Sequence, residues 1–130
     1  MARRRAVLGL VVGAFLLLSA FAHSVLGGSG IRGEMAKVGV PEELAQGLII
    51  GWYLGGAAML VFGAIVLSAF WSGFRGRRVS LIPPFLIGLG YLGFAVVALV
   101  ISRFEPFFLA VFGVPGLLLA IASSTPDSGE

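Results

Sequence analysis

Four long apolar runs divide the chain, and short segments rich in polar or charged residues separate them. The runs cover residues 6–27, 45–71, 81–102 and 106–122. A helix needs about 20 predominantly apolar residues to cross the roughly 30 Å hydrocarbon core of a bilayer. Three runs reach this length and the fourth approaches it. The pattern therefore predicts an all-α polytopic membrane protein, with four transmembrane helices in a single domain, 1–130.

The first run has a rival interpretation as a secretory signal peptide, because basic residues precede it. Its apolar stretch is longer than the apolar region of a signal peptide, and the following HSVLGGSG is a poor match to a small-x-small cleavage site. We therefore expect residues 6–27 to remain in the protein as a membrane span.

Prolines mark several of the expected helix boundaries. Pro41 and the two glutamates after it suit the first turn of the second span, where a missing N–H is harmless and acids favour the helix dipole. The connection before that span, residues 28–44, is expected to hold a short surface helix that ends near Val40. Pro115 lies inside the fourth run and removes a helical hydrogen bond, so we expect a kink there.

Charge is scarce and unevenly placed. Charged residues make up 12% of the chain, about half the share of an ordinary soluble domain. Two arginine clusters flank apolar runs: Arg3, Arg4 and Arg5, and then Arg75, Arg77 and Arg78. Such clusters are typical of the cytoplasmic side of a membrane protein rather than of nucleic-acid binding. We therefore expect a multi-pass protein of the cell membrane, with both termini and the second connection in the cytoplasm (N-in/C-in).

Two stripes of small residues at helical spacing indicate close packing between the first two spans, because small residues let backbones approach in lipid. The stripes consist of Gly9, Gly13 and Ala20 on the first span and Gly51, Gly55 and Ala58 on the second. Packing within the chain is the favoured interpretation. A docking face for another protein is the alternative, because the second span has another small face at Gly56 and Gly63.

The third run contains GLGYLG, residues 88–93, which matches the dinucleotide-binding pattern G-x-G-x-x-G letter for letter. That pattern needs a strand, a tight turn and the start of a helix in water. Here the glycines lie in the middle of an apolar run, so we expect an ordinary membrane helix without nucleotide binding.

Polar side chains that could bind a ligand are few, and no acid or lysine lies in the central part of a span. The candidates are His23, Trp52, Tyr53 and Tyr91. The first three share a depth near the outer surface and are expected to gather around one outer mouth. Tyr91 lies in the middle of the third span, where its hydroxyl needs a partner such as Ser19 or Ser68.

His23 is the only histidine in the sequence, and two roles are open to it. A neutral imidazole can hydrogen-bond a neighbour such as Tyr53, a backbone carbonyl or interfacial water, and this structural role is favoured. The alternative is ligation of a haem iron or a chlorin magnesium. The sequence indicates no other metal site and requires no cofactor, and the absence of cysteine excludes thiolate ligands.

The stretch FAHSVLGG, followed by a modest loop and GWYLGGAAMLVFGAIVL, resembles small four-helix bacterial membrane proteins. These proteins carry a histidine-serine-x-leucine-glycine stretch at the end of their first span. The resemblance covers about half of the chain and implies the architecture only, because such proteins have no established activity.

The scarcity of titratable groups argues against a proton pump or an ion-coupled transporter. We expect a structural or accessory subunit of a respiratory, photosynthetic or transport complex, whose partners are the lipid bilayer and other membrane subunits or a second copy of itself. The alternative is a small binding protein for a lipid, quinone or pigment near His23. An enzyme ranks last, because no spacing in the sequence enforces a catalytic geometry.

Overall fold

The computed structural model describes residues 1–124, and within them every regular element is helical. In chain order the elements are α1 (Arg3–Ala22), η1 (His23–Gly27), α2 (Gly28–Val38), α3 (Glu42–Phe74), α4 (Ile82–Ile101), η2 (Leu109–Gly113) and α5 (Val114–Ser124). The elements η1 and η2 are single π-helical turns. The expected all-α fold is confirmed.

Three of the helical segments are long and apolar enough to cross a membrane: Arg3–Val38, Glu42–Phe74 and Ile82–Ile101. The fourth expected span, 106–122, is a shorter apolar helix over Leu109–Ser124. At 1.5 Å per residue it is roughly 24 Å long, less than the full hydrocarbon thickness.

The first hairpin is longer than the sequence pattern indicates. Elements α1, η1 and α2 form one 36-residue rod, roughly 54 Å long. The helix expected in the first connection therefore continues the first span and does not lie separately on a surface. Gly39 ends the rod in a left-handed conformation (φ 68°), and the N–H of Val40 bonds to the carbonyl of Met35. This helix ending reverses the chain into α3, whose first turn carries the two glutamates after Pro41, as expected.

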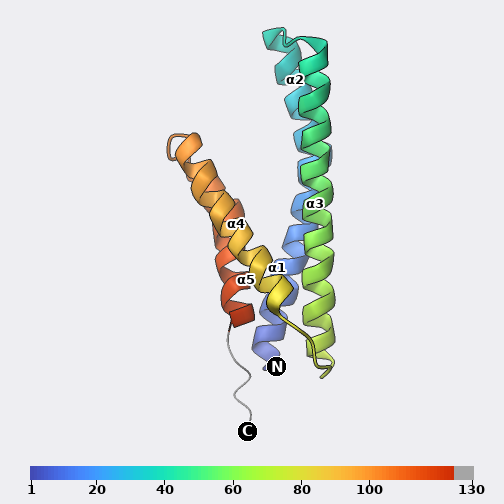
Figure 1. The fold of residues 1–130 in the computed structure, drawn as a ribbon, viewed down its shortest axis with the longest axis vertical. Coiled ribbons are helices and arrows are strands. Elements are labelled where there is room, and N and C mark those ends of the chain that lie inside the picture. The colour runs from blue at the N-terminus through green and yellow to red at the C-terminus, as the bar shows by residue number, and fades with distance from the viewer. Residues whose placement is uncertain (125–130) are drawn as a thin grey trace.

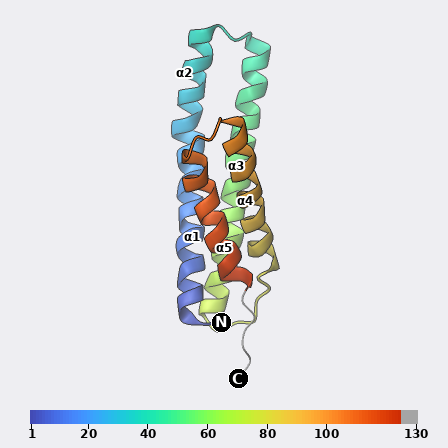
Figure 2. The same ribbon diagram turned by 90° about the vertical axis from the view of Figure 1, so that its left-hand side faces the viewer.

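The second hairpin, α4 with η2 and α5, leans away from the first, so the molecule has the outline of a V (Figure 1). The two hairpins meet near the end that holds the N-terminus and the connection between α3 and α4. At the opposite end α2 and the start of α3 rise beyond the second hairpin (Figure 2). The four helices therefore do not close around one outer mouth, contrary to expectation.

Helices α1 and α3 pack along a seam of small residues. Gly9 lies against the ring of Phe70, and a Cβ at Gly13 would come within 2.9 Å of Leu67. On α3 the seam uses Gly63, where a Cβ would lie 2.8 Å from the side chain of Leu17. Gly9 and Gly13 of the first-span stripe thus contact α3 as expected, and Ala20 is buried.

The second-span stripe does not form this seam, and the expected packing role of Gly51 is wrong. Gly51 is exposed, and a Cβ there would meet no atom within 4 Å. Gly55 and Ala58 instead line a cavity between the hairpins. Gly56 and Gly63 are both buried, so α3 is rotated to present its other small face to α1.

Helices α4 and α5 touch through their backbones. A Cβ on Gly88 would lie 2.8 Å from the backbone nitrogen of Ala120, and one on Gly116 would lie 2.8 Å from the carbonyl oxygen of Gly88. The GLGYLG run is therefore helical throughout, and its first glycine serves helix packing. The expected irregularity near Pro115 takes the form of η2, a π-helical turn that ends at Gly113, two residues before the proline.

The junction of the two hairpins holds the core, in which the largest fully buried side chains are Phe70, Leu16 and Leu119. Arg5 ties the start of α1 to the end of α5 through the carbonyl oxygens of Ala122 and Ser123. A cation at the C-terminal end of a helix also favours the helix dipole. This junction fixes one end of the V and leaves the other end open.

Candidate functional site

His23 and Trp52 form a reciprocal contact, which we call the His–Trp clasp, between the first and second spans. The indole N–H of Trp52 donates to the carbonyl oxygen of His23 at 2.8 Å. His23 Nε2 lies 3.1 Å from the carbonyl oxygen of Trp52. The two rings are stacked, with centroids 4.1 Å apart and planes 7° from parallel. The clasp therefore joins each side chain to the backbone of the other helix.

The clasp determines the tautomer of the imidazole. A backbone carbonyl oxygen only accepts hydrogen bonds, so Nε2 of His23 must carry the proton. In the neutral ring Nδ1 then has a free lone pair. The structural role favoured for His23, hydrogen bonding to a backbone carbonyl, is the one observed, and Nε2 is the nitrogen that is engaged.

The glycines beside His23 make the clasp possible. A Cβ on Gly27 would lie 2.6 Å from the indole of Trp52, and one on Gly28 would lie 3.0 Å from the hydroxyl of Tyr53. On the facing helix a Cβ on Gly56 would overlap the hydroxyl of Ser24. The turn η1 begins at His23 and includes Gly27, so the π-helical geometry coincides with this contact.

Tyr53 does not join His23 at a common site. Its ring lies under the guanidinium of Arg32, with 5.7 Å from Arg32 Cζ to the ring centroid. Together with Ser24, Val25 and Ser29 these residues line a separate hollow of about 320 Å³. Tyr53 is thus a contact residue between α3 and the rod.

A cavity of about 330 Å³ lies between the two hairpins, and we call it the inter-hairpin cavity. Helix α3 contributes Gly55, Ala58, Met59 and Phe62, helix α4 contributes Ile87, Gly90, Tyr91 and Phe94, and His23 and Phe112 complete the lining. His23 and Tyr91 are the only lining residues with a polar side-chain group. Two of the four candidate residues therefore share one cavity, although they are far apart in the sequence.

Tyr91 is 8% exposed, and its hydroxyl has no hydrogen-bond partner within the described residues. The expected bond to Ser19 or Ser68 is wrong: Ser68 is exposed on α3, and the Tyr91 ring packs beside Phe112 with 5.9 Å between centroids. A buried polar group that lacks a partner costs about 1–3 kcal/mol. The hydroxyl oxygen is itself buried, and Tyr91 belongs to the core cluster that includes Leu16, Phe70 and Leu119.

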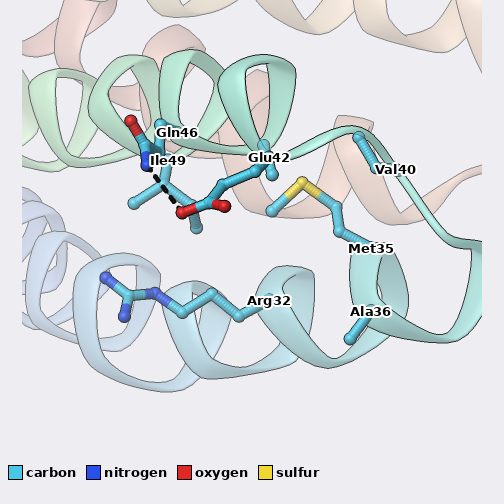
Figure 3. A pocket seen from close by; sticks show the side chains of 8 residues that line it. Arg32, Met35, Ala36, Val40, Glu42, Gln46 and Ile49 are labelled. Atoms are coloured by element: carbon cyan, nitrogen blue, oxygen red, sulfur yellow. Dashed lines mark hydrogen bonds between the residues drawn. The ribbon is translucent and has the colours of Figure 1, made fainter.

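A third hollow lies between α2 and the start of α3, with a volume of about 420 Å³ (Figure 3). Its lining includes Arg32, Met35, Glu42 and Gln46. Glu42 accepts a hydrogen bond of 3.2 Å from the Gln46 amide, while Arg32 lies on the facing helix. This hollow belongs to the part of the first hairpin that rises beyond the second.

Within residues 1–124 no three histidine, aspartate or glutamate side chains are grouped so that they could hold a metal ion. Ligation by His23 would have to use Nδ1, because Nε2 is bonded to a carbonyl. The inter-hairpin cavity itself is mainly apolar.

Sequence reasoning missed Gly28, Phe94 and Phe112 as parts of this region. The glycine pairs at 27–28 and 55–56 were an available signal, since each pair lies within a turn of the residues that contact the other helix. No comparable signal marked the phenylalanines, because 11 of them are spread along the chain.

Comparison with protein-family models, with curated proteins and with solved structures finds no match to this chain. Proposals about function therefore depend on the geometry described above.

Proposed function

We propose that the chain is an accessory subunit of a larger membrane assembly, inserted in the cell membrane with its N- and C-termini in the cytoplasm. Three helices long and apolar enough to span support the insertion. The positions of the arginines support the orientation, because Lys and Arg accumulate on the cytoplasmic side of membrane proteins. The clusters at residues 3–5 and 75–78 belong to the same end of the V, where the N-terminus lies (Figure 1). The first connection then lies outside.

The observation that carries the accessory role is the projecting segment, which we define as α2 together with residues 42–51 of α3. It rises beyond the second hairpin (Figure 2), and α2 contacts only η1 and α3 among the described elements. Helix α3 has 33 residues, roughly 50 Å at 1.5 Å per residue, against the ~30 Å hydrocarbon core. Part of α3 therefore extends outside the bilayer.

The projecting segment carries apolar side chains that no residue in the described part of the chain covers. Leu44 is 56% exposed, and Leu48, one turn further along the same face of α3, is 46% exposed. Inside a bilayer such exposure is ordinary, but beyond it a contiguous apolar face marks an interaction site. A partner subunit that covers this face would remove the apolar surface from water.

The test is extraction from its native membrane in a mild detergent, followed by native mass spectrometry. We expect a particle far heavier than the 13.5 kDa chain, containing subunits of other sequence. Replacing Leu44 and Leu48 together with glutamine should release the chain from that particle. Lys37→Gln, on the exposed side of α2, is the matched control and should leave the particle intact.

Recovery of the wild-type chain only as a monomer would overturn the accessory role. A particle whose mass is an exact multiple of the chain's own mass would contain copies of this chain alone. That result would favour self-association through the same face over the accessory role.

The inter-hairpin cavity supports a second candidate function, the binding of a small lipid-soluble molecule. This function does not exclude the first, because the cavity and the projecting segment are formed by different parts of α3. Absorbance and mass spectra of the gently purified protein test it directly, and a bound molecule should co-purify.

A further inference from the structure

We propose that the groove between α2 and α3 binds the headgroup of a phospholipid that carries a phosphate and a primary ammonium, with the phosphate at Arg32 and the ammonium at Glu42. The inference rests on insertion in a membrane, which is part of the proposed function. It depends neither on the accessory role nor on the inter-hairpin cavity.

Two of the hollows described above make up this groove, and Arg32 lines both of them. The side chains of α3 that line them include Glu42, Gln46, Ile49 and Tyr53, which follow one another three or four residues apart. Residues at this spacing are neighbours on one face of a helix. The two hollows therefore lie along one face of α3 as parts of a single groove, which we call the α2–α3 groove.

The depth of the groove follows from the lengths of the helices. A hydrocarbon core of about 30 Å corresponds to about 20 helical residues. Counted from the arginine cluster next to each helix, its far boundary falls near Val25 on the rod and near Gly55 on α3. The two counts agree, because the adjacent residues Ser24 and Gly56 are in contact. One hollow of the groove therefore lies at the boundary and the other lies beyond it.

Arg32 brings an accessible cation to the level of lipid phosphates. Among residues 1–124 it forms no ion pair, since the nearby Lys37 pairs with Glu34 at 2.7 Å. Its side chain extends back along the rod, away from the turn at Val40 (Figure 3), and its Cζ lies 5.7 Å from the ring centroid of Tyr53. The guanidinium thereby enters the headgroup layer, which adds roughly 5–8 Å to each side of the hydrocarbon core. A guanidinium fits phosphate oxygens closely.

Hydroxyl groups line the part of the groove nearest the hydrocarbon. Ser24, Ser29 and Tyr53 lie there beside Arg32. Ser29 donates to the carbonyl oxygen of Leu26, which leaves the hydroxyls of Ser24 and Tyr53 for oxygen atoms of a ligand. Tyr53 is 42% exposed, so a lipid can reach it.

The part of the groove furthest from the hydrocarbon supplies a negative charge. The carboxylate of Glu42 is exposed and lies nearer the turn at Val40 than the guanidinium of Arg32 does (Figure 3). It accepts a hydrogen bond of 3.2 Å from Gln46 and has lone pairs for further donors. A primary ammonium has three such donors. The quaternary ammonium of choline has none and is recognised by aromatic cages, whereas the lining of this hollow contains no aromatic residue.

The order of these groups along the membrane normal selects the ligand. From the hydrocarbon outward, a phospholipid with an ethanolamine headgroup presents ester oxygens, a phosphate and an ammonium. The α2–α3 groove presents hydroxyls, a guanidinium and a carboxylate in the same order. A lipid with a glycerol headgroup would place no cation at Glu42.

The accessory role uses a different side of α3. Successive helical residues are about 100° apart, so Leu44 and Leu48 lie about 200–240° around the helix from Glu42. A partner subunit on that face and a lipid in the α2–α3 groove therefore do not compete, and either proposal can fail alone.

The experiment titrates the purified protein in detergent with three dioleoyl phospholipids that differ only in the headgroup: ethanolamine, glycerol or choline. Native mass spectrometry counts the lipids that stay bound. We expect one saturable site that binds the ethanolamine lipid at least about fivefold more tightly than the other two, because only its ammonium forms a charge-assisted hydrogen bond with Glu42.

Two pairs of variants test the two charges. Arg32→Gln should weaken the binding of all three lipids about tenfold, the effect of one hydrogen bond to a charged group. Lys37→Gln removes the same charge from the same helix outside the groove and should bind as the parent does. Glu42→Gln should abolish the preference for the ethanolamine lipid over the glycerol lipid, whereas Glu43→Gln, at the next position, should keep it.

A soluble competitor separates a lipid site from a site for a free phosphate ester. Glycerophosphoethanolamine has the same headgroup without acyl chains, and an excess of it should leave the lipid bound. Complete displacement of the lipid would overturn the proposal in favour of a soluble ligand.

Equal binding of the three lipids by the parent, or equal losses in the Arg32 and Lys37 variants, would overturn the proposal by showing ordinary contact with surrounding lipid. Tighter binding of the glycerol lipid than of the ethanolamine lipid would overturn the role of Glu42. Insertion is checked separately: release of the protein from membranes by alkaline carbonate would refute insertion itself, whereas an inserted protein without a lipid preference refutes only this inference.

Discussion

At the scale of residues, the His–Trp clasp is the contact whose chemistry is best defined. Trp52→Phe removes the indole donor to the His23 carbonyl and part of the stacking, so we expect a loss of about 1–2 kcal/mol in the free energy of unfolding in detergent. His23→Gln places an amide N–H near the position of Nε2 and should lose less than His23→Leu, which has no donor. Thermal melting measures all three.

Equal losses for the glutamine and leucine variants of His23 would show that the hydrogen bond from Nε2 to the Trp52 carbonyl contributes nothing. Full stability of Trp52→Phe would show the same for the hydrogen bond from the indole N–H to the His23 carbonyl.

At the scale of elements, the seam between α1 and α3 depends on which small face of α3 is used. Gly56→Leu should separate the two helices, because even a Cβ there overlaps the hydroxyl of Ser24. In Gly51→Leu the new side chain extends into open space, so the free energy of unfolding should stay within about 0.5 kcal/mol of the parent value. The melting temperatures of the two variants in detergent provide the comparison. A greater loss for the Gly51 variant would mean that the other face of α3 forms the seam.

The second hairpin depends on backbone contact between α4 and α5. Gly88→Ala places a methyl group 2.8 Å from the Ala120 nitrogen, and backbone atoms cannot move aside as a flexible side chain can. We expect a loss of about 1–3 kcal/mol, as for other overpacked sites. Gly90→Ala, on the same helix but facing open space, should be neutral. Equal melting curves for the two variants would contradict the close backbone contact between α4 and α5 at Gly88.

At the scale of the whole molecule, the orientation in the membrane can be tested because the chain has no cysteine. A cysteine replacing Lys37, in α2, should react with an impermeant maleimide in intact cells. A cysteine replacing Ser80, in the connection that follows the second arginine cluster, should react only after the cells are opened. The reverse labelling pattern would invert the proposed topology. The last six residues lie outside the described part of the chain, so they are not used as a label site.

Hydrophobic pattern and charge were enough to predict the helices. The length of an apolar run and the positions of prolines depend only on residues that are close in the sequence, and these features largely decide where a helix begins and ends. The runs at 45–71 and 81–102 agree closely with the cores of α3 and α4. The same reasoning underestimated the first rod, since α2 is moderately polar and its helix is stabilised by packing against α3. It also could not show that η1 and η2 are π-helical, because such turns depend on contacts with neighbouring helices.

By itself the sequence determined that this protein is all-helical, that its long apolar helices suit a membrane, and that His23 and Trp52 share one depth. Those features follow from composition and spacing along a single helix. The tertiary structure decided which small face of α3 meets α1, which residues surround the inter-hairpin cavity, and that Tyr91 has no partner among the described residues. Rotation of a helix about its axis and divergence of two hairpins depend on the summed fit of distant surfaces, which no local pattern records.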